Sequence, residues 1–191
     1  NMIAIACDHG GYNLKLAVIN YLEENKIEYK DFGTDSEQSC DYADFAKSCA
    51  SQRYDNLKIA LDCANGASYE CAKLVFKELG AQTVLINNIP NGFNINENCG
   101  STHIEGLKKF VVENKCDMGF AFDGDCDRCI AVDENGNVVD GDAMMFILGK
   151  RLKARGMLNK NTVVATVMSN SGLMTSLKEA GISCEQTTVG D

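Results

Sequence analysis

Three aspartates alternate along the chain at Asp123, Asp125 and Asp127. In an extended backbone, residues two apart point to the same side, so this spacing predicts that the three carboxylates converge on one spot. Three unpaired carboxylates repel one another strongly, and a divalent cation resolves that repulsion. Oxygen ligands favour magnesium, manganese or calcium over zinc. The pattern therefore predicts a site for one of these hard cations.

Two residues beside the aspartates extend the pattern. Gly124 lets the backbone bend tightly between the first two carboxylates, because glycine tolerates conformations that other residues avoid. Arg128 follows the last aspartate, and its planar guanidinium group suits a phosphate beside a metal ion. The segment 123–128 therefore predicts a combined metal and phosphate site.

Two other interpretations compete with this one. An EF-hand calcium loop also alternates aspartates and ends in Glu at its twelfth position, where Glu134 stands. Its sixth position should be Gly but is Arg128, and the flanking segments predict strands instead of helices, so we reject the EF-hand. The second alternative is three solvated aspartates on an exposed loop, which composition alone leaves open.

The elements that must position these residues alternate between strands and helices. Short apolar runs predict strands over residues 3–7, 27–32, 58–62, 83–86, 118–122, 129–132 and 162–168. Helical spacing of apolar residues predicts helices over residues 14–22, 41–50, 71–79, 104–111, 142–156 and 171–181, with Asp142 as the N-cap of the fifth. The alternation predicts an α/β architecture with a largely parallel sheet, in which the aspartates join two strands.

Local composition divides the chain. The polar stretch 51–56 predicts a domain boundary near residue 53, so we expect a partial Rossmann-like unit over residues 1–52 and an α/β domain over 54–158. Residues 159–191 begin a further domain. The Asn-rich segment 87–100 predicts a long loop, and long loops in compact domains are often functional.

Composition and charge limit the classes of partner and the location that we expect for the protein. The 191 residues are 45% hydrophobic and 24% charged, and the net charge is −9 without a basic patch, which argues against nucleic acid as a partner. No apolar run approaches the roughly 20 residues that cross a bilayer. The ten cysteines lie mostly in apolar segments, which is typical of reduced thiols in a cytoplasmic protein.

The aspartate loop resembles a known signature. Residues 123–128 are similar to the D-G-D-G-D-R motif of the phosphohexomutase superfamily. Further motifs resemble the phosphoglucosamine mutase branch, and these are residues 61–67, 94–103, 120–122, 139–142 and 166–170. The resemblance extends over residues 54–191.

This resemblance implies an Mg²⁺-dependent phosphoryl transfer that interconverts glucosamine 6-phosphate and glucosamine 1-phosphate. It implies that Asp123, Asp125 and Asp127 bind Mg²⁺ and that Arg128 contacts phosphate. Cys126 replaces the middle glycine of the motif, which the loop tolerates if the φ of Cys126 is negative. The phosphoserine loop of the family has no counterpart here, so we assign no catalytic residue and expect this chain to be incomplete as a mutase.

Two further regions carry candidate substrate-side residues. His103 is either a helix-start residue bonded locally or a substrate contact, and we weigh these equally. Residues 3–11, 31–36 and 41–42 resemble the start of ribose-5-phosphate isomerase B, which implies that Asp8, His9 and Tyr42 line a sugar-phosphate site.

The catalytic cysteine loop of that isomerase family is absent, so for Asp8 and His9 we favour a polar turn in which Asp8 caps the next helix. The remaining alternatives to a mutase are an isomerase of this second family and a non-catalytic module that binds metal and phosphate. Incomplete sheets also predict self-association.

Overall fold

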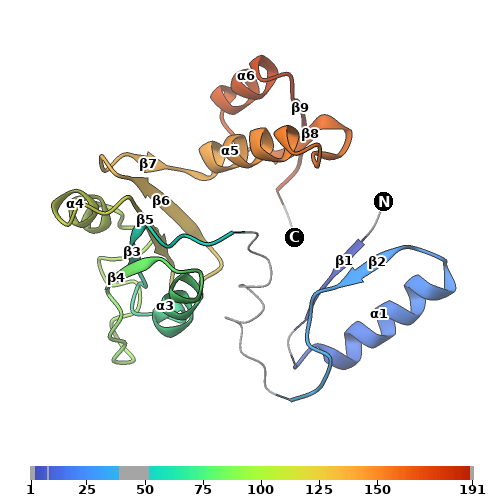
Figure 1. Ribbon diagram of the computed structural model, residues 1–191, viewed down its shortest axis with the longest axis horizontal. Coiled ribbons are helices and arrows are strands. Elements are labelled where there is room, and N and C mark those ends of the chain that lie inside the picture. Colours follow the sequence, from blue (N-terminus) through green and yellow to red (C-terminus); the bar gives the residue numbers. More distant parts are fainter. Residues whose placement is uncertain (1–2, 8, 39–51, 190–191) are drawn as a thin grey trace.

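The computed structural model describes residues 3–7, 9–38 and 52–189. Within these residues the strands form three sheets, drawn in Figure 1. The helix expected over residues 41–50 lies outside the described residues. The α/β class predicted from the alternation of elements is confirmed.

The first sheet belongs to a small N-terminal unit. It consists of β1 (Ile3–Ile5), α1 (Tyr12–Glu24) and β2 (Tyr29–Asp31), and its two strands are parallel. Lys15 on α1 is buried, and its ammonium group lies 2.6 Å from Asp31 and also donates to the carbonyl oxygen of Thr34. This strand–helix–strand order is the partial Rossmann-like unit that the sequence predicts.

The second sheet has the strand order β4-β3-β5-β6-β7. Its strands are β3 (Lys58–Asp62), β4 (Gln82–Ile86), β5 (Met118–Phe122), β6 (Cys129–Asp133) and β7 (Val138–Val139). Strands β4, β3 and β5 are parallel, whereas β6 and β7 are antiparallel to their neighbours. The expectation of a largely parallel sheet is thus wrong for the β5-β6-β7 part of this sheet. The short connections after β5 and β6 cannot make the long crossover that parallel pairing needs.

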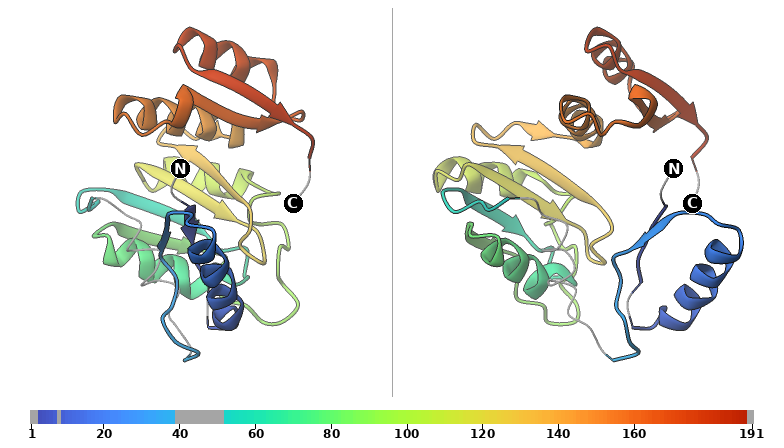
Figure 2. Two further views of the ribbon diagram at one scale, coloured as in Figure 1. Left: turned by 90° about the vertical axis from the view of Figure 1, so that its right-hand side faces the viewer. Right: turned by 45° about the vertical axis from the view of Figure 1, so that its right-hand side comes forward.

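Two helices cover opposite faces of this sheet (Figures 1 and 2). Helix α3 (Ser68–Glu78) packs on the face that carries Ile59 and Leu61, while α4 (Glu105–Glu113) packs on the face that carries Ala60. Side chains of a strand alternate between faces, so three consecutive residues of β3 supply both cores. The interior strand β3 is therefore packed on both faces, and its carboxyl end is a rigid support for nearby loops.

The third sheet follows α5 (Gly141–Ala154) and the short 3-10 helix η1 (Asn159–Asn161). It pairs β8 (Thr162–Thr166) with β9 (Ser183–Thr187) in parallel across α6 (Ser171–Glu179). Met145 and Phe146 of α5 pack against the core around α6 and β8, and α5 also contacts β7. The domain division that we place at residue 158 remains a prediction.

The N-cap of α5 is Asp140 and not Asp142. An oxygen of Asp140 accepts a hydrogen bond from the backbone N–H of Ala143 at 2.9 Å. Asp142 lies in the first turn, and its carboxylate accepts from the backbone N–H of Asn170 at 2.9 Å. The sequence offered two aspartates two positions apart, and the one with extended backbone becomes the cap.

Among the described residues, no helix combines the length and apolar character needed to cross a lipid bilayer.

Candidate metal centre

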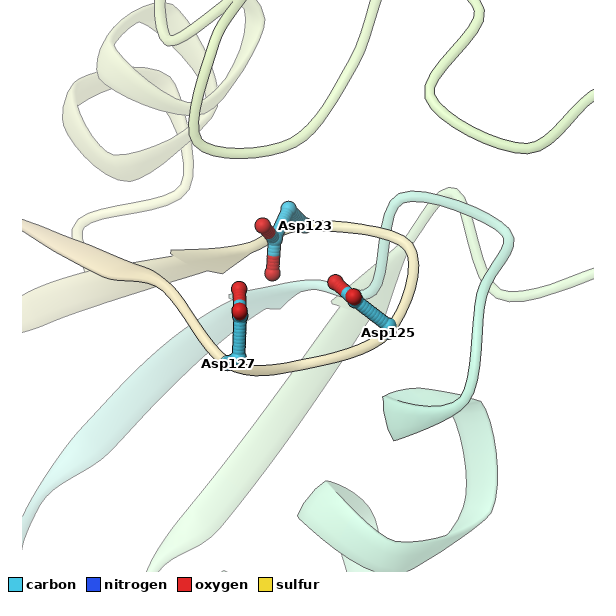
Figure 3. A group of neighbouring side chains, drawn as sticks. All are labelled: Asp123, Asp125 and Asp127. Atoms are coloured by element: carbon cyan, nitrogen blue, oxygen red, sulfur yellow. The ribbon is translucent and has the colours of Figure 1, made fainter. Parts of the chain in front are cut away.

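The three aspartates lie in the loop that joins β5 to β6. One carboxylate oxygen from each of Asp123, Asp125 and Asp127 lies within 4.8 Å of the others, and Figure 3 shows the three side chains pointing into the same space. The loop forms a turn between antiparallel strands, not an extended segment. The structure therefore brings the predicted ligands together, but by folding the loop back on itself and not by simple alternation.

Asp123 is the anchor of the loop. It is 1% exposed, and the backbone N–H of Arg128 donates to its Oδ1 at 3.0 Å. The Nε of Arg128 donates to its Oδ2 at 2.5 Å and lies 3.6 Å from an oxygen of Asp127. Among the described residues, none accepts a hydrogen bond from the terminal guanidinium nitrogens of Arg128. Arg128 thus holds the first candidate ligand, Asp123, through its backbone N–H and its Nε.

Charge in the loop is unevenly compensated. Burial alone would raise the pKa of Asp123, but the hydrogen bonds from Arg128 outweigh burial and lower that pKa below its ordinary value. A hydrogen bond with Asp123 and the negative charges of Asp125 and Asp123 raise the pKa of Asp127. One arginine therefore does not neutralise three carboxylates. Asp127 retains a proton more readily than a free aspartate does.

The backbone at Cys126 is strained. Its φ is +68°, in the left-handed region that residues other than glycine avoid. The condition set for Cys126 in place of glycine, a negative φ, is therefore not met, because the tight turn places a left-handed residue before Asp127. Cys126 keeps the loop conformation at an energetic cost that glycine would not carry.

Two neighbouring segments support the loop from outside. The carbonyl oxygen of Gly124 accepts a hydrogen bond from the N–H of Ala67 at 2.8 Å, at the start of α3. A Cβ on Gly66 would overlap that same carbonyl, and a Cβ on Gly124 would lie 2.6 Å from Ile95. Ile95 belongs to the Asn-rich loop, so this loop packs against the aspartate loop at Gly124.

These supports were missed in the sequence analysis. The pattern at 123–128 predicts the ligands. Gly66 and Ile95 are distant from it in sequence, and only the folded chain brings them next to the loop. The signal that could have found Gly66 is its place in an Asn-Gly turn directly after a buried strand.

The donor set fits a hard divalent cation. It offers three carboxylates, of which one is buried and two are exposed. Among the described residues it is the one group of three or more acidic, histidine or cysteine side chains with this proximity. Carboxylate oxygens suit Mg²⁺, Mn²⁺ or Ca²⁺, and the strands on both sides exclude the helix–loop–helix of an EF-hand.

His103 lies two residues before α4, next to its N-cap residue Ile104. Its Nδ1 lies 3.2 Å from the hydroxyl of Thr102, and its backbone N–H donates to the carbonyl oxygen of Gly100 at 3.0 Å. These contacts are local, as the helix-start interpretation expects. The substrate-side role of His103 stays a prediction.

The isomerase-like residues are only partly described. His9 lies between β1 and α1, and its carbonyl oxygen accepts from the N–H of Tyr12 at 3.5 Å. Asp8 and Tyr42 lie outside the described residues. The proposed sugar-phosphate site of these three residues stays a prediction.

Fold and site together define an α/β/α domain with a carboxylate loop beside the carboxyl ends of its parallel strands. Family models agree with this class. Residues 40–136 match the phosphoglucomutase/phosphomannomutase alpha/beta/alpha domain II, and residues 140–191 match domain III of the same family. The chain belongs to the phosphoglucomutase/phosphomannomutase family.

The curated relatives with high identity to this chain are phosphoglucosamine mutases. Phosphoglucosamine mutases from Acetivibrio thermocellus and Clostridium acetobutylicum are each 58% identical over 151 residues, which is 79% of this chain and 34% of either relative. The phosphoglucosamine mutase of Clostridium botulinum is 55% identical over 157 residues. This chain spans about a third of the length of these relatives.

Solved structures support the fold. A phosphoglucomutase/phosphomannomutase family protein from Burkholderia thailandensis aligns with a TM-score of 0.64 at 21% identity, over 93% of this chain and 39% of that one. A structure from Thermus thermophilus aligns with a TM-score of 0.54 at 17% identity, over 76% of this chain and 33% of that one.

Proposed function

We propose that this chain forms the Mg²⁺- and phosphate-binding part of a phosphohexomutase that interconverts glucosamine 6-phosphate and glucosamine 1-phosphate. The observation that carries the proposal is the convergence of Asp123, Asp125 and Asp127 within 4.8 Å. Membership of the phosphohexomutase family and the names of the relatives support the reaction and the amino-sugar substrate.

The residues of the loop have different roles in binding the metal ion and the phosphate. Asp123, held by Arg128, presents a fixed oxygen, while the exposed Asp125 and Asp127 complete the ligand set from the other side of the turn. The terminal nitrogens of Arg128 can hold a phosphate oxygen next to this set. A bound divalent cation would neutralise negative charge on the phosphoryl group during its transfer.

Titration calorimetry with Mg²⁺ tests the metal assignment. We expect the purified chain to bind one Mg²⁺ and Asp125→Asn to weaken this binding by at least about ten-fold. Mutation of residues that only hydrogen-bond to a metal ligand already lowers metal affinity by about that factor. Asp125 is exposed, so the substitution leaves the core intact.

Glu134→Gln is the matched control. It removes the same single negative charge from an exposed position that would be the twelfth of an EF-hand loop. We expect its Mg²⁺ affinity to equal that of the unmodified chain. Equal affinities for Asp125→Asn and the unmodified chain would refute the metal site. An equal loss with Glu134→Gln would mean that a lower negative charge, and not a lost ligand, weakens binding, and would also contradict the assignment.

The chain alone should not complete the reaction, because its sequence holds no counterpart of the phosphoserine loop of the family. We expect no conversion of glucosamine 6-phosphate by the purified chain with Mg²⁺, measured by phosphorus NMR. Turnover that persists in preparations from a host lacking its own mutase would contradict this expectation.

A further inference from the structure

Asp62 is a fully buried carboxylate at the carboxyl end of β3, outside the aspartate loop. Its Oδ1 accepts a hydrogen bond from the backbone N–H of Ala64 at 3.0 Å. Its Oδ2 accepts one from the backbone N–H of Gly100 at 3.0 Å. Among the described residues no cationic side chain pairs with it, so this buried carboxyl group is held by two backbone donors from segments that are far apart in sequence.

The first of these segments is the turn after β3. Ala64 and Asn65 both have positive φ, at 49° and 48°, which is an unfavourable conformation for residues other than glycine. The bond from Ala64 to Asp62 stabilises this turn. The turn leads directly to Gly66, which packs against the Gly124 carbonyl, and to Ala67, whose N–H binds that carbonyl.

The second segment is the end of the Asn-rich loop. Gly100 has a φ of +75°, and a Cβ there would lie 2.5 Å from the carbonyl oxygen of Phe122 and 2.7 Å from the Cβ of Ala64. The next N–H, that of Ser101, donates to the same Phe122 carbonyl at 2.9 Å. Phe122 is the residue before Asp123, so this segment fixes the point where the aspartate loop begins.

We infer that Asp62 is a positioning residue for the metal site. It acts through these two segments, the turn 64–67 and residues 100–101, which we call the two walls. Each wall is held by one carboxylate oxygen of Asp62. One wall fixes Gly124 and the other fixes Phe122, so together they set the backbone on both sides of the buried ligand Asp123. The inference rests on the proposed function, because it assumes that the aspartate loop binds a cation. Asp62 is not one of the three grouped carboxylates, so its role is to position them and not to bind the cation.

The test is the affinity for Mg²⁺ of the full chain carrying Asp62→Asn, measured by titration calorimetry. Asparagine has nearly the same shape but only one acceptor oxygen, so one of the two walls loses its bond. We expect binding about ten-fold weaker or more, as for other residues that orient metal ligands. Affinity unchanged in a folded Asp62→Asn chain would overturn the inference.

Cys116→Ala is the control for general destabilisation. Cys116 is also buried, but it precedes β5 at the opposite end of the same sheet. We expect this variant to unfold at lower denaturant concentration and to keep its Mg²⁺ affinity. An equal loss of affinity in Cys116→Ala would mean that any weakening of the domain reduces binding, and would overturn a specific role for Asp62.

Hydrogen exchange of the unmodified chain gives a second test that does not depend on a variant folding. If the walls position the ligands, bound metal must in return stabilise the walls, because coupling between sites is reciprocal. We expect Mg²⁺ to slow exchange at the N–H groups of Ala64, Gly100 and Ser101. Exchange unchanged at saturating Mg²⁺ would overturn the inference, whereas an unmodified chain that binds no Mg²⁺ would refute the proposed function itself.

Discussion

At the scale of single residues, the aspartate loop combines one buried ligand with a strained backbone. Asp123 is fixed by two bonds from Arg128, whereas Cys126 holds a φ of +68° between the two exposed aspartates. The sequence pattern was enough to choose the three aspartates that the fold brings together. The left-handed backbone at Cys126 could not be predicted from the pattern, because it depends on how sharply the antiparallel strands β5 and β6 are joined.

Replacing Cys126 by glycine should stabilise the loop. Relief of left-handed strain is worth about 1–2 kcal/mol, and the greater freedom of glycine in the unfolded chain offsets about 0.5–1 kcal/mol of it. We therefore expect Cys126→Gly to raise the free energy of unfolding by about 0.5–1 kcal/mol in urea denaturation. Cys129→Ser, which changes an exposed thiol in a strand, should give no such gain, and a destabilised Cys126→Gly would contradict the strain.

At the scale of elements, close contact between α4 and β5 fixes the strand that leads into the loop. A Cβ on Gly119 would lie 2.6 Å from Val111 and 3.0 Å from Leu107, both fully buried on α4. Glycine at this strand position therefore sets the distance between helix and sheet.

A matched pair of glycine substitutions tests this contact. We expect Gly119→Ala to lower the free energy of unfolding by about 1–3 kcal/mol through overpacking. Gly106→Ala adds the same methyl group on α4 where nothing lies within 4 Å, and should raise stability by about 0.5–1 kcal/mol. Equal effects of the two substitutions in urea denaturation would show that α4 and β5 are not tightly packed.

The turn between β6 and β7 depends on a carboxylate. Asp133 accepts bonds from the backbone N–H of Asn135 at 2.9 Å and from the backbone and side chain of Asn137 at 2.8 and 3.0 Å. The Asn137 side chain and these backbone bonds lower the pKa of Asp133 below its ordinary value.

This lowered pKa gives a pH dependence with a definite sign. The unfolded chain binds the proton more tightly, so the contribution of Asp133 to stability is complete above its ordinary pKa and is lost as the pH falls through the lowered one. The difference in free energy of unfolding between the unmodified chain and Asp133→Ala should therefore be larger at about pH 6 than at about pH 2.5. A difference that does not change with pH would contradict the bonded turn.

Element order was more predictable from the sequence than element geometry. Apolar runs located β3, β5 and β6, because these strands are buried and short. The antiparallel direction of β6 and β7 was not predicted, since periodicity gives no strand direction. The cap of α5 was misplaced by two residues, and the two bonds of Asp62 connect segments that only the folded sheet brings together.

At the scale of the whole molecule, the described sheets expose several edges. Strands β4 and β7 end the central sheet, and the β8–β9 pair has two open edges. Two-stranded sheets are marginally stable on their own, and open edges pair readily with other chains. The 151 residues matched are 34% of such a relative, which is therefore more than twice as long as this chain.

Self-association through these edges can be measured by sedimentation velocity. We expect the average sedimentation coefficient to rise with protein concentration. Val164 on β8 is 61% exposed, and Val164→Lys should reduce the rise, because lysine on an edge strand opposes pairing. A single monomeric species at all concentrations would contradict the expectation.

We expect Asp123, Asp125 and Asp127 to bind one divalent cation together. The most direct measurement is an anomalous difference map from crystals of the chain grown with Mn²⁺, which replaces Mg²⁺ at oxygen sites. We expect one strong peak at about 2.2 Å from an oxygen of each aspartate, with Arg128 still bonded to Asp123. A peak held by other residues, or none at a Mn²⁺ concentration that saturates binding in solution, would contradict it.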